Sequence, residues 1–268
     1  MIPLLQVEDL HAQAGGESVL RGVDLELRSG ELHAVMGPTG PPGSGISSLA
    51  NVLMGDPSIQ VTSGLIRFHG EDITRWPPDV RGKAGLFLAF QHPEPVPGLP
   101  LTQFLGQALA ARGGPDCSVV ELRETVAEWA RILGIELRLE TRFLNQGLSA
   151  QDRSLHEILQ MAVLAPEIAI LDEVTSPSQH DAVHDVAARD VVAAHGAVTP
   201  PDAVARGVRE VRRQRPELAS LVVTRYHQVA RVFEPSKVHV LLDGRVVAAG
   251  GPELVDRIEQ EGYESWRP

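Results

Sequence analysis

Cysteine is almost absent from this chain, since Cys117 is the only one among 268 residues. A lone thiol can form no intrachain disulfide, no CxxC pair and no cysteine-ligated cluster held by this chain alone. A chain of this length buries enough apolar surface to fold without covalent staples. We therefore expect a reducing compartment, and we interpret Cys117 as a buried or incidental thiol.

Long apolar runs and an excess of basic charge are also missing. The sequence contains no stretch of about 18 consecutive apolar residues, and residues 1–10 have neither the basic region nor the apolar segment of a signal peptide. Basic side chains number 24 against 35 acidic ones, which leaves a net charge of −11. That charge argues against nonspecific binding to nucleic acid or anionic membranes. We expect a cytoplasmic protein with no nucleic-acid partner and no direct membrane insertion.

Two kinds of catalytic motif are absent as well. The histidines include no HExxH, so a metal-dependent hydrolase has little support. No G-x-S-x-G elbow surrounds Ser149, so nucleophilic serine chemistry is not expected there.

Glycine and proline are abundant, with 25 and 20 copies, and 43% of the residues are hydrophobic. This composition is typical of a loop-rich α/β protein. Polar–apolar alternation predicts antiparallel strands at residues 4–10 and 19–27, joined at Gly15-Gly16. Apolar runs predict buried strands at residues 32–36, 85–90, 168–171 and 218–224, with an edge strand at 64–70 and a hairpin of 238–242 and 245–248 around Asp243-Gly244. Helical periodicity covers residues 47–54, 101–135, 147–164, 254–261 and, interrupted by a loop at Pro200-Pro201, 174–215.

The most informative stretch is residues 32–50, which read LHAVMGPTGPPGSGISSLA. A strand that turns through glycines into a helix N-terminus holds phosphates, because backbone N–H groups can approach the anion and the helix dipole favours its charge. From Gly40 to Ser47 the stretch follows G-x-x-x-x-G-K-[ST], except that Ile46 occupies the lysine position. An ordinary Gly-Pro surface loop is the alternative. The predicted phosphate-loop residues are Gly37, Pro38, Thr39, Gly40, Gly43, Ser44, Gly45, Ile46, Ser47 and Ser48.

Several segments together resemble a known family. A phosphate loop, Gln91 at a strand end, a helix that begins at Ser149 and the pair Asp172-Glu173 after a strand follow the order of ABC-type ATPase domains. The segments RSGELHAVMGP, GLFLAFQHPEPVPG, HEILQMAVLAPEIAILDE, KVHVLLDGRVVAAGGPEL and EGYESW are similar to the SufC family, the ABC-type ATPases of iron–sulfur cluster assembly, and especially to its actinobacterial members. The resemblance is weakest at residues 113–141 and 184–218. It implies one ABC-type P-loop domain, α/β with a mixed central sheet, flanking helices and an N-terminal antiparallel β part, whose core (1–91 and 165–268) carries an inserted helical subdomain (92–164).

The resemblance also implies a site and partners. In that family ATP lies between two subunits, with the phosphate loop of one facing the signature helix of the other. By position, Ser47, Gln91 and Asp172 would serve Mg²⁺ and Glu173 would polarise the attacking water. The implied partners are SufB- and SufD-like assembly proteins, which could dock at residues 92–101, and a second ABC subunit in a homodimer or heterodimer.

Four of the implied motifs are altered in this chain. Ile46 removes a charged hydrogen bond worth about 1.5–3 kcal/mol, or roughly one to two powers of ten in nucleotide affinity. The signature expected as SGGE or SGGQ reads Ser149, Ala150, Gln151 and Asp152, and the loop expected as SGLD reads Ser176, Pro177, Ser178 and Gln179. The switch histidine is Arg225, which could bind a phosphate but cannot shuttle a proton at neutral pH.

Three hypotheses remain open at this point. The first is a SufC-like ATP-binding subunit whose hydrolysis is very weak or lost. The second is a catalytically silent scaffold that keeps the docking surface for its partners. The third, which the SufC-like segments disfavour, is the nucleotide-binding subunit of a membrane transporter.

Overall fold

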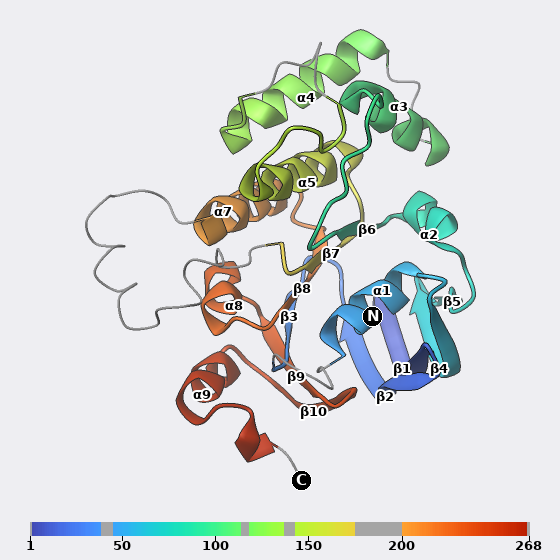
Figure 1. Ribbon diagram of the computed structural model, residues 1–268, viewed down its shortest axis with the longest axis vertical. Helices are drawn as coiled ribbons and strands as arrows, with labels where there is room; N and C mark the ends of the chain where they lie inside the picture. Colours follow the sequence, from blue (N-terminus) through green and yellow to red (C-terminus); the bar gives the residue numbers. More distant parts are fainter. Residues whose placement is uncertain (1, 39–44, 114–117, 137–142, 175–199, 267–268) are drawn as a thin grey trace.

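The computed structural model describes residues 2–38, 45–113, 118–136, 143–174 and 200–266. Its strands form two sheets: a four-stranded sheet in the order β2-β1-β4-β5 and a six-stranded sheet in the order β10-β9-β3-β8-β7-β6 (Figure 1). Helix α1 (Ile46–Met54) lies between the two sheets, because its apolar residues share one core cluster with residues of both. This is the α/β architecture, with an antiparallel β part and a mixed central sheet, that the resemblance implies.

The four-stranded sheet is built from the N-terminal part of the chain. Strands β1 (Leu5–Ala14) and β2 (Glu17–Leu27) are antiparallel. They turn at Gly15 and Gly16, whose φ angles of 57° and 86° favour glycine, so this prediction is confirmed. Strand β4 (Ile59–Phe68) pairs with the other side of β1 and begins five residues before the strand predicted at residue 64. The short β5 (Glu71–Asp72) pairs only with the last two residues of β4.

The six-stranded sheet is mostly parallel and deeply buried. Strand β3 (Leu32–Met36) runs parallel between β8 (Ala219–Thr224) and β9 (Lys237–Leu242), and β7 (Ile168–Asp172) and β6 (Leu86–Ala89) follow beyond β8. All five residues of β3 and of β7 are buried, as apolar runs predict. The predicted hairpin is confirmed as β9 and the antiparallel β10 (Arg245–Gly250). Asp243 and Gly244 at its turn both have positive φ, the conformation that a tight hairpin turn requires.

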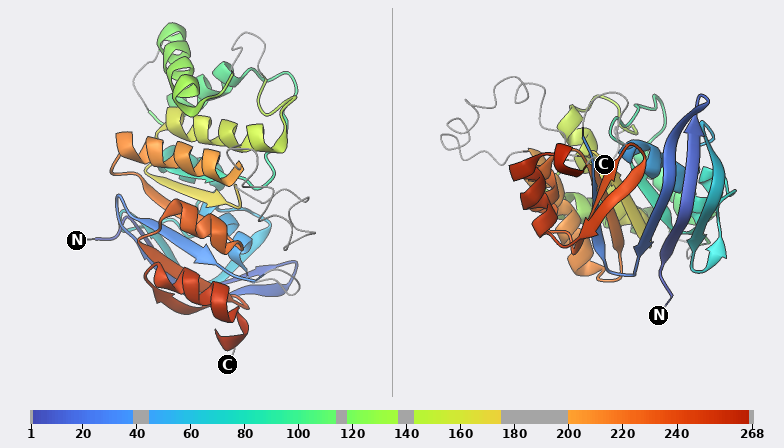
Figure 2. Two further views of the ribbon diagram at one scale, coloured as in Figure 1. Left: turned by 90° about the vertical axis from the view of Figure 1, so that its left-hand side faces the viewer. Right: turned by 90° about the horizontal axis from the view of Figure 1, so that it is seen from below.

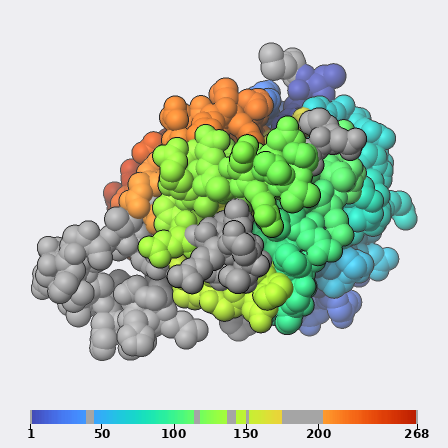
Figure 3. Space-filling model, turned by 90° about the horizontal axis from the view of Figure 1, so that it is seen from above, coloured from blue at the N-terminus to red at the C-terminus, as the bar shows by residue number. Residues whose placement is uncertain are grey.

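Helix α2 (Pro78–Ala84) packs beside α1, and the other helices lie on the opposite side of the six-stranded sheet. Their bounds are α3 (Leu101–Ala111), α4 (Val119–Leu133), α5 (Ala150–Leu164), α7 (Pro200–Gln214), α8 (His227–Phe233), α9 (Glu253–Glu261) and a final 3₁₀ turn (Glu264–Trp266). Helices α5, α7, α8 and α9 follow one another along one side of the molecule (Figure 2). Helices α3 and α4 pack on α5 and form the upper face (Figure 3).

The structure corrects three features of the helical prediction. Residues 101–135 form two helices, α3 and α4, rather than one continuous helical stretch. Pro200 and Pro201, expected in a loop, begin α7, because proline lacks only a backbone donor that a first helical turn does not use. Helices α2 and α8 had not been predicted. None of the helices that the structure describes has the length and apolar character needed to cross a bilayer.

Candidate nucleotide-binding site

The ends of three parallel strands and the start of α1 bring the predicted site residues together. Asp172 is the last residue of β7, and Ser47 lies in the first turn of α1. The Ser47 hydroxyl donates a hydrogen bond to Asp172 Oδ1 over 3.2 Å. Asp172 is 6% exposed, and burial, helped by the negative charge of Glu173, raises its pKa to about 6. A hydroxyl and a buried carboxylate that lacks a full positive counter-charge make a suitable place for a divalent cation.

Glu173 is held by two neighbours from different strands. Gln91, just beyond β6, donates through Nε2 to Glu173 Oε2 over 2.6 Å. Arg225, just beyond β8, donates through Nε to Glu173 Oε1 and forms an ion pair with it. The Glu173 side chain is only 1% exposed, and its backbone has a φ of 45°, which is strained for a residue other than glycine. The contacts of Glu173 therefore fix its carboxylate at the end of the sheet.

Ile46 does not face this polar group. Its side chain is 4% exposed and belongs to the core cluster between the two sheets. Gly45 ahead of it has a φ of 86°, and a Cβ there would lie 2.7 Å from the Val19 carbonyl oxygen, so only glycine fits. The lysine position at the start of α1 is thus part of the apolar core.

The predicted signature residues lie at the start of α5. Ser149 is the N-cap, as predicted: its hydroxyl accepts a hydrogen bond from the Asp152 backbone N–H over 3.1 Å and donates to Asp152 Oδ2 over 2.7 Å. Ala150 and Gln151 occupy the first two helical positions. Both the backbone and the side chain of Asp152 are therefore hydrogen-bonded to Ser149 at the start of α5.

Some predicted site residues lie outside the described part of the chain. They are Thr39, Gly40, Gly43 and Ser44 of the phosphate loop, Cys117, and Ser176, Pro177, Ser178 and Gln179 of the altered SGLD loop. Of the other loop residues, Gly37 follows β3 in a buried position, and Pro38 and Ser48 are half-buried.

The sequence analysis missed one buried acid next to this site. Glu157 on α5 is 4% exposed; it accepts from the Phe90 backbone N–H over 3.4 Å and from Gln160 Nε2 over 3.0 Å. Burial raises its pKa to about 7. Because Phe90 immediately precedes Gln91, this contact joins α5 to the strand end that holds Glu173. The only sequence signal was an acid four residues before Met161 on a helix with many apolar residues.

The residues present fit Mg²⁺ bound together with a phosphate better than a metal held by protein alone. Within the described residues, no three His, Cys, Asp or Glu side chains gather as a metal site. When Mg²⁺ is bound together with phosphates, the protein usually supplies only one or two oxygen ligands, such as a hydroxyl and a carboxylate. Phosphate oxygens and water molecules provide the other ligands. The N-terminus of α1 could contribute backbone N–H groups to a phosphate, but residue 46 contributes no charge.

Comparison with known proteins agrees with this geometry. The family model described as ABC transporter matches residues 20–176. The chain belongs to this family. ABC ATP-binding domains bind nucleotide, generally with Mg²⁺, so the polar group at the strand ends lies in a nucleotide-binding cassette.

Curated relatives of this ABC domain match it almost end to end. It is 36% identical over 262 residues to vegetative protein 296 of Bacillus subtilis (strain 168), covering 97% of this chain and 92% of that one. It is 34% identical to a probable ABC transporter ATP-binding protein of Streptococcus pyogenes serotype M3, covering 97% and 93%. It is also 34% identical to the probable ATP-dependent transporter ycf16 of Pyropia yezoensis, covering 97% and 96%.

Solved ABC cassettes share the fold at lower identity. The dimeric structure of MJ0796, a bacterial ABC transporter cassette, is 20% identical with a TM-score of 0.70, covering 92% of this chain and 98% of that one. A nucleotide-free ATP-binding cassette from an ABC transporter is 18% identical with a TM-score of 0.70 over both full chains. At these identities the likeness establishes the fold alone.

Proposed function

We propose that this ABC domain is the SufC-like ATP-binding subunit of a cytoplasmic iron–sulfur cluster assembly complex, and that its own ATP hydrolysis is very weak or lost. The SufC-like segments, spread from the N-terminal part of the chain to its last residues, support the assembly role. The single observation that supports the loss of hydrolysis is the hydrogen bonding of Glu173. Its two carboxylate oxygens accept hydrogen bonds from Gln91 and Arg225.

Each site residue has a stated part in this proposal. Ser47 and Asp172 would hold Mg²⁺ with the phosphates, Asp172 through water, and Gln91 would contact the metal or the attacking water. Glu173 would orient that water, but water must first displace Arg225 or Gln91 from its oxygens. With Ile46 in the core, no lysine neutralises the charge that develops on the transferring phosphoryl group. Binding of Mg-ATP can therefore survive in weakened form while turnover does not.

The same proposal gives the region around residues 92–101 the role of a docking surface. Phe90, Val96 and Phe143 are exposed to 52%, 39% and 38%. Val96 donates a backbone hydrogen bond to Leu144 beside Phe143, so two of the three side chains come from adjacent backbone segments. Apolar side chains exposed next to Gln91 offer SufB- or SufD-like partners a contact through which nucleotide binding could be sensed. Val96 and Phe143 belong to the inserted helical part of the domain, residues 92–164, and Phe90 lies just before it.

A transporter subunit is the second candidate, and one specific observation favours it. The relative in Streptococcus pyogenes is named a probable ABC transporter ATP-binding protein, and the one in Pyropia yezoensis a probable ATP-dependent transporter. In that case the same apolar surface would dock a membrane-spanning partner. A silent scaffold that binds no nucleotide is the third candidate, and the buried Ile46 favours it.

Calorimetric titration of the purified protein with Mg-ATP separates a nucleotide switch from a silent scaffold. We expect weak binding by the natural chain and binding about 10- to 100-fold tighter by Ile46→Lys, because the long lysine side chain can leave the core and donate one charged hydrogen bond to the phosphates. Ile46→Leu is the matched control, because it changes the same core position without adding charge. No heat at millimolar ATP from a folded protein, in both the natural chain and Ile46→Lys, would leave the silent scaffold as the answer.

Copurification from the native cell separates the assembly and transporter roles. An affinity-tagged chain should recover soluble SufB- or SufD-like proteins, and Phe90→Ser, which removes an exposed ring, should reduce that recovery. Val119→Ser is the control, since Val119 is 66% exposed on α4 and lies outside the proposed surface. Recovery of a multi-span membrane protein instead would overturn the assembly role.

A further inference from the structure

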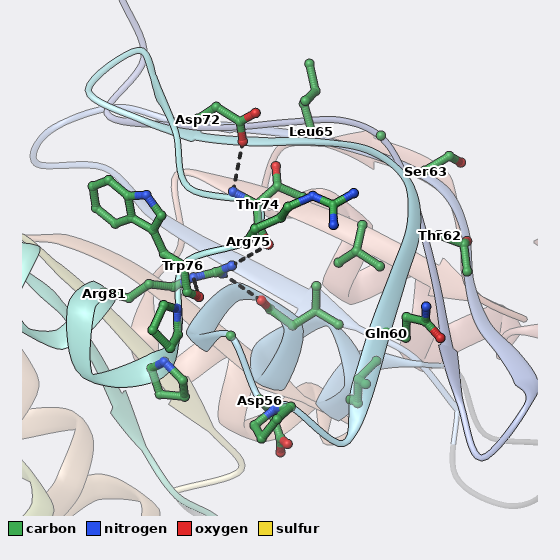
Figure 4. Close-up of a pocket in the computed structure, with 18 residues that line it drawn as sticks. Asp56, Gln60, Thr62, Ser63, Leu65, Asp72, Thr74, Arg75, Trp76 and Arg81 are labelled. Carbon is green, nitrogen blue, oxygen red and sulfur yellow. Dashed lines mark hydrogen bonds between the residues drawn. The ribbon is translucent and has the colours of Figure 1, made fainter.

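A second site lies at the opposite end of α1 from Ser47. A pocket with a volume of 790 Å³ is bounded by the end of α1, the strand β4 and the loop that leads into α2 (Figure 4). It is lined by both polar and apolar residues, including Asp56, Thr62, Arg75 and Trp76. Because α1 separates this pocket from the strand ends, it is not part of the nucleotide site.

The pocket runs along the edge of a strand. Seven consecutive residues of β4, 59–65, line it. Side chains alternate between the two faces of a strand, so a cavity that touches every consecutive residue must follow the strand's edge and its backbone. On the other side, β4 is already paired with β1. The pocket is therefore shaped around backbone rather than around one sheet face.

That edge of β4 has no strand partner among the described residues. Strand β5 pairs only with Arg67 and Phe68, and the loop after it reaches no further than Ile66 through a backbone bond from Ile73 and the Thr74 hydroxyl. An unpaired edge presents a row of backbone N–H and C=O groups to another extended chain.

The edge lacks charge and proline, two usual protections against pairing, although Gly64, with a φ of 89°, interrupts its extended backbone. Natural edge strands carry charged residues or proline that discourage a further strand. Residues 59–65 read IQVTSGL, with no charge and no proline, and with three β-branched residues that favour extended structure. Such an edge is suited to accept a strand rather than to repel one.

Arg75 supplies a charge in the pocket. Its guanidinium extends into the cavity toward the side occupied by Thr62 and Ser63 (Figure 4). The two acids nearby are engaged locally: Asp72 accepts from Thr74 N–H over 2.9 Å, and Asp56 accepts from Ser58 N–H over 2.8 Å. Among the described residues Arg75 has no hydrogen bond or salt bridge, although its charge contributes to lowering the pKa of Asp72, after the larger effect of the Thr74 hydrogen bonds. Arg75 is therefore available to pair with an incoming carboxylate.

We propose that this pocket binds an extended peptide segment of a partner protein, which adds a strand to the β4 edge and places an acidic side chain on Arg75. Backbone hydrogen bonds to residues 59–65 would supply affinity, and Arg75 would supply the preference for acid. The half-buried Trp76 offers an apolar surface to a neighbouring side chain of the peptide. This docking role is independent of whether the chain hydrolyses ATP.

The test uses the full chain and a capped hexapeptide, acetyl-Val-Thr-Glu-Val-Thr-Val-amide, in two-dimensional NMR titrations. We expect shifts of the backbone amides of residues 59–65 and of the Trp76 indole. The same peptide with lysine in place of glutamate should bind about tenfold more weakly, and the preference should reverse in Arg75→Glu. Arg67→Glu is the matched control variant, since Arg67 pairs with Glu8 outside the pocket.

Backbone methylation of the peptide distinguishes strand addition from simple charge binding. N-methyl groups on alternate residues remove the donors along one peptide edge, so methylating the edge that faces β4 should abolish binding. Equal binding by both methylated forms and the parent peptide would overturn strand addition, and no difference between the glutamate and lysine peptides would overturn the role of Arg75. A concentration-dependent dimer of the free protein that Thr62→Pro abolishes would instead make a second copy of the chain the occupant and overturn the proposal.

Discussion

Two regions of this molecule bury charge, and they satisfy it in different ways. Arg81 on α2 is 1% exposed and directs all five of its guanidinium donors to backbone carbonyls. The acceptors are Val52, Leu53, Ile73, Thr74 and Trp76, at 2.7–3.0 Å. At the strand ends, Glu173 pairs with Arg225, whereas Asp172 accepts a hydrogen bond from the Ser47 hydroxyl, and burial and the charge of Glu173 raise its pKa to about 6.

The difference separates structure from function. Arg81 joins the end of α1 to the loop before α2, and its hydrogen-bonding capacity is used up, so it can serve nothing but the fold. Asp172, Glu173 and Arg225 together carry two negative charges and one positive charge. This group can therefore bind a cation that does not come from the chain itself. A buried charge indicates a ligand site only where its own protein leaves it incompletely neutralised.

The largest expected effect is at Arg81. Replacement by leucine leaves five buried carbonyls without their donor, and we expect the free energy of unfolding to fall by about 3–5 kcal/mol. Urea unfolding followed by circular dichroism measures this. Arg75→Leu, an exposed arginine on the same loop, should change it by less than about 0.5 kcal/mol. Similar losses in both variants would mean that Arg81 is not the structural charge described above.

The second prediction concerns Glu157, a buried carboxylate that accepts hydrogen bonds but has no positively charged partner among the interactions described above. Its pKa is raised to about 7 in the folded chain against an ordinary value of 4.5, so the native state holds this proton more tightly than the unfolded state. The resulting stabilisation is complete below about pH 4.5 and is lost as the pH rises through 7. Glu157→Gln should raise the free energy of unfolding at pH 8 by about 1–3 kcal/mol and flatten its decline above pH 4.5. The exposed Glu124→Gln on α4 should change neither, and an unchanged pH profile in Glu157→Gln would contradict the assignment.

The buried histidine pair of the six-stranded sheet should respond to pH in the opposite direction. His239 Nε2 lies 3.3 Å from His33 Nδ1, and burial, with a smaller contribution from the charge of His33, lowers the pKa of His239 to about 3. The unfolded chain takes up this proton below the ordinary value of 6.5, so stability is complete above pH 6.5 and falls as the pH drops toward 3. We expect a loss of about 2 kcal/mol at pH 5, largely absent from His239→Gln. His69→Gln, with a side chain 56% exposed, is the control, and an acid transition identical to that of the natural chain in His239→Gln would contradict the prediction.

Much of the fold could be predicted because its signals are local. The apolar runs of β3 and β7, the Asp243-Gly244 turn and the Ser149 cap each depend on a few neighbouring residues. What could not be predicted depends on residues far apart in the chain. Pairing of Arg225 with Glu173 spans 52 positions, and the contact from Glu157 to Phe90 spans 67, so neither leaves a pattern in sequence.

At Ile46 the sequence motif was recognised, but the surroundings of the side chain could not be predicted. The motif identified the missing lysine, but only the packing of two sheets on α1 shows that the isoleucine joins the apolar core. The positions of the site residues could therefore be predicted from the sequence. The ion pair and the raised pKa values at the site could not.

The smallest expected effect is the one that decides what Arg225 does. In the Ile46→Lys background, Arg225→His should release Glu173 from its ion pair and raise Mg-ATP turnover about tenfold, because the carboxylate becomes available to the attacking water and a histidine can transfer a proton near neutral pH. Arg225→Gln is the matched control: it removes the ion pair without restoring proton transfer, so it should recover less of the turnover. Phosphate release under single-turnover conditions measures both. If neither substitution raises turnover while Mg-ATP binds normally, the ion pair between Arg225 and Glu173 is not what limits hydrolysis.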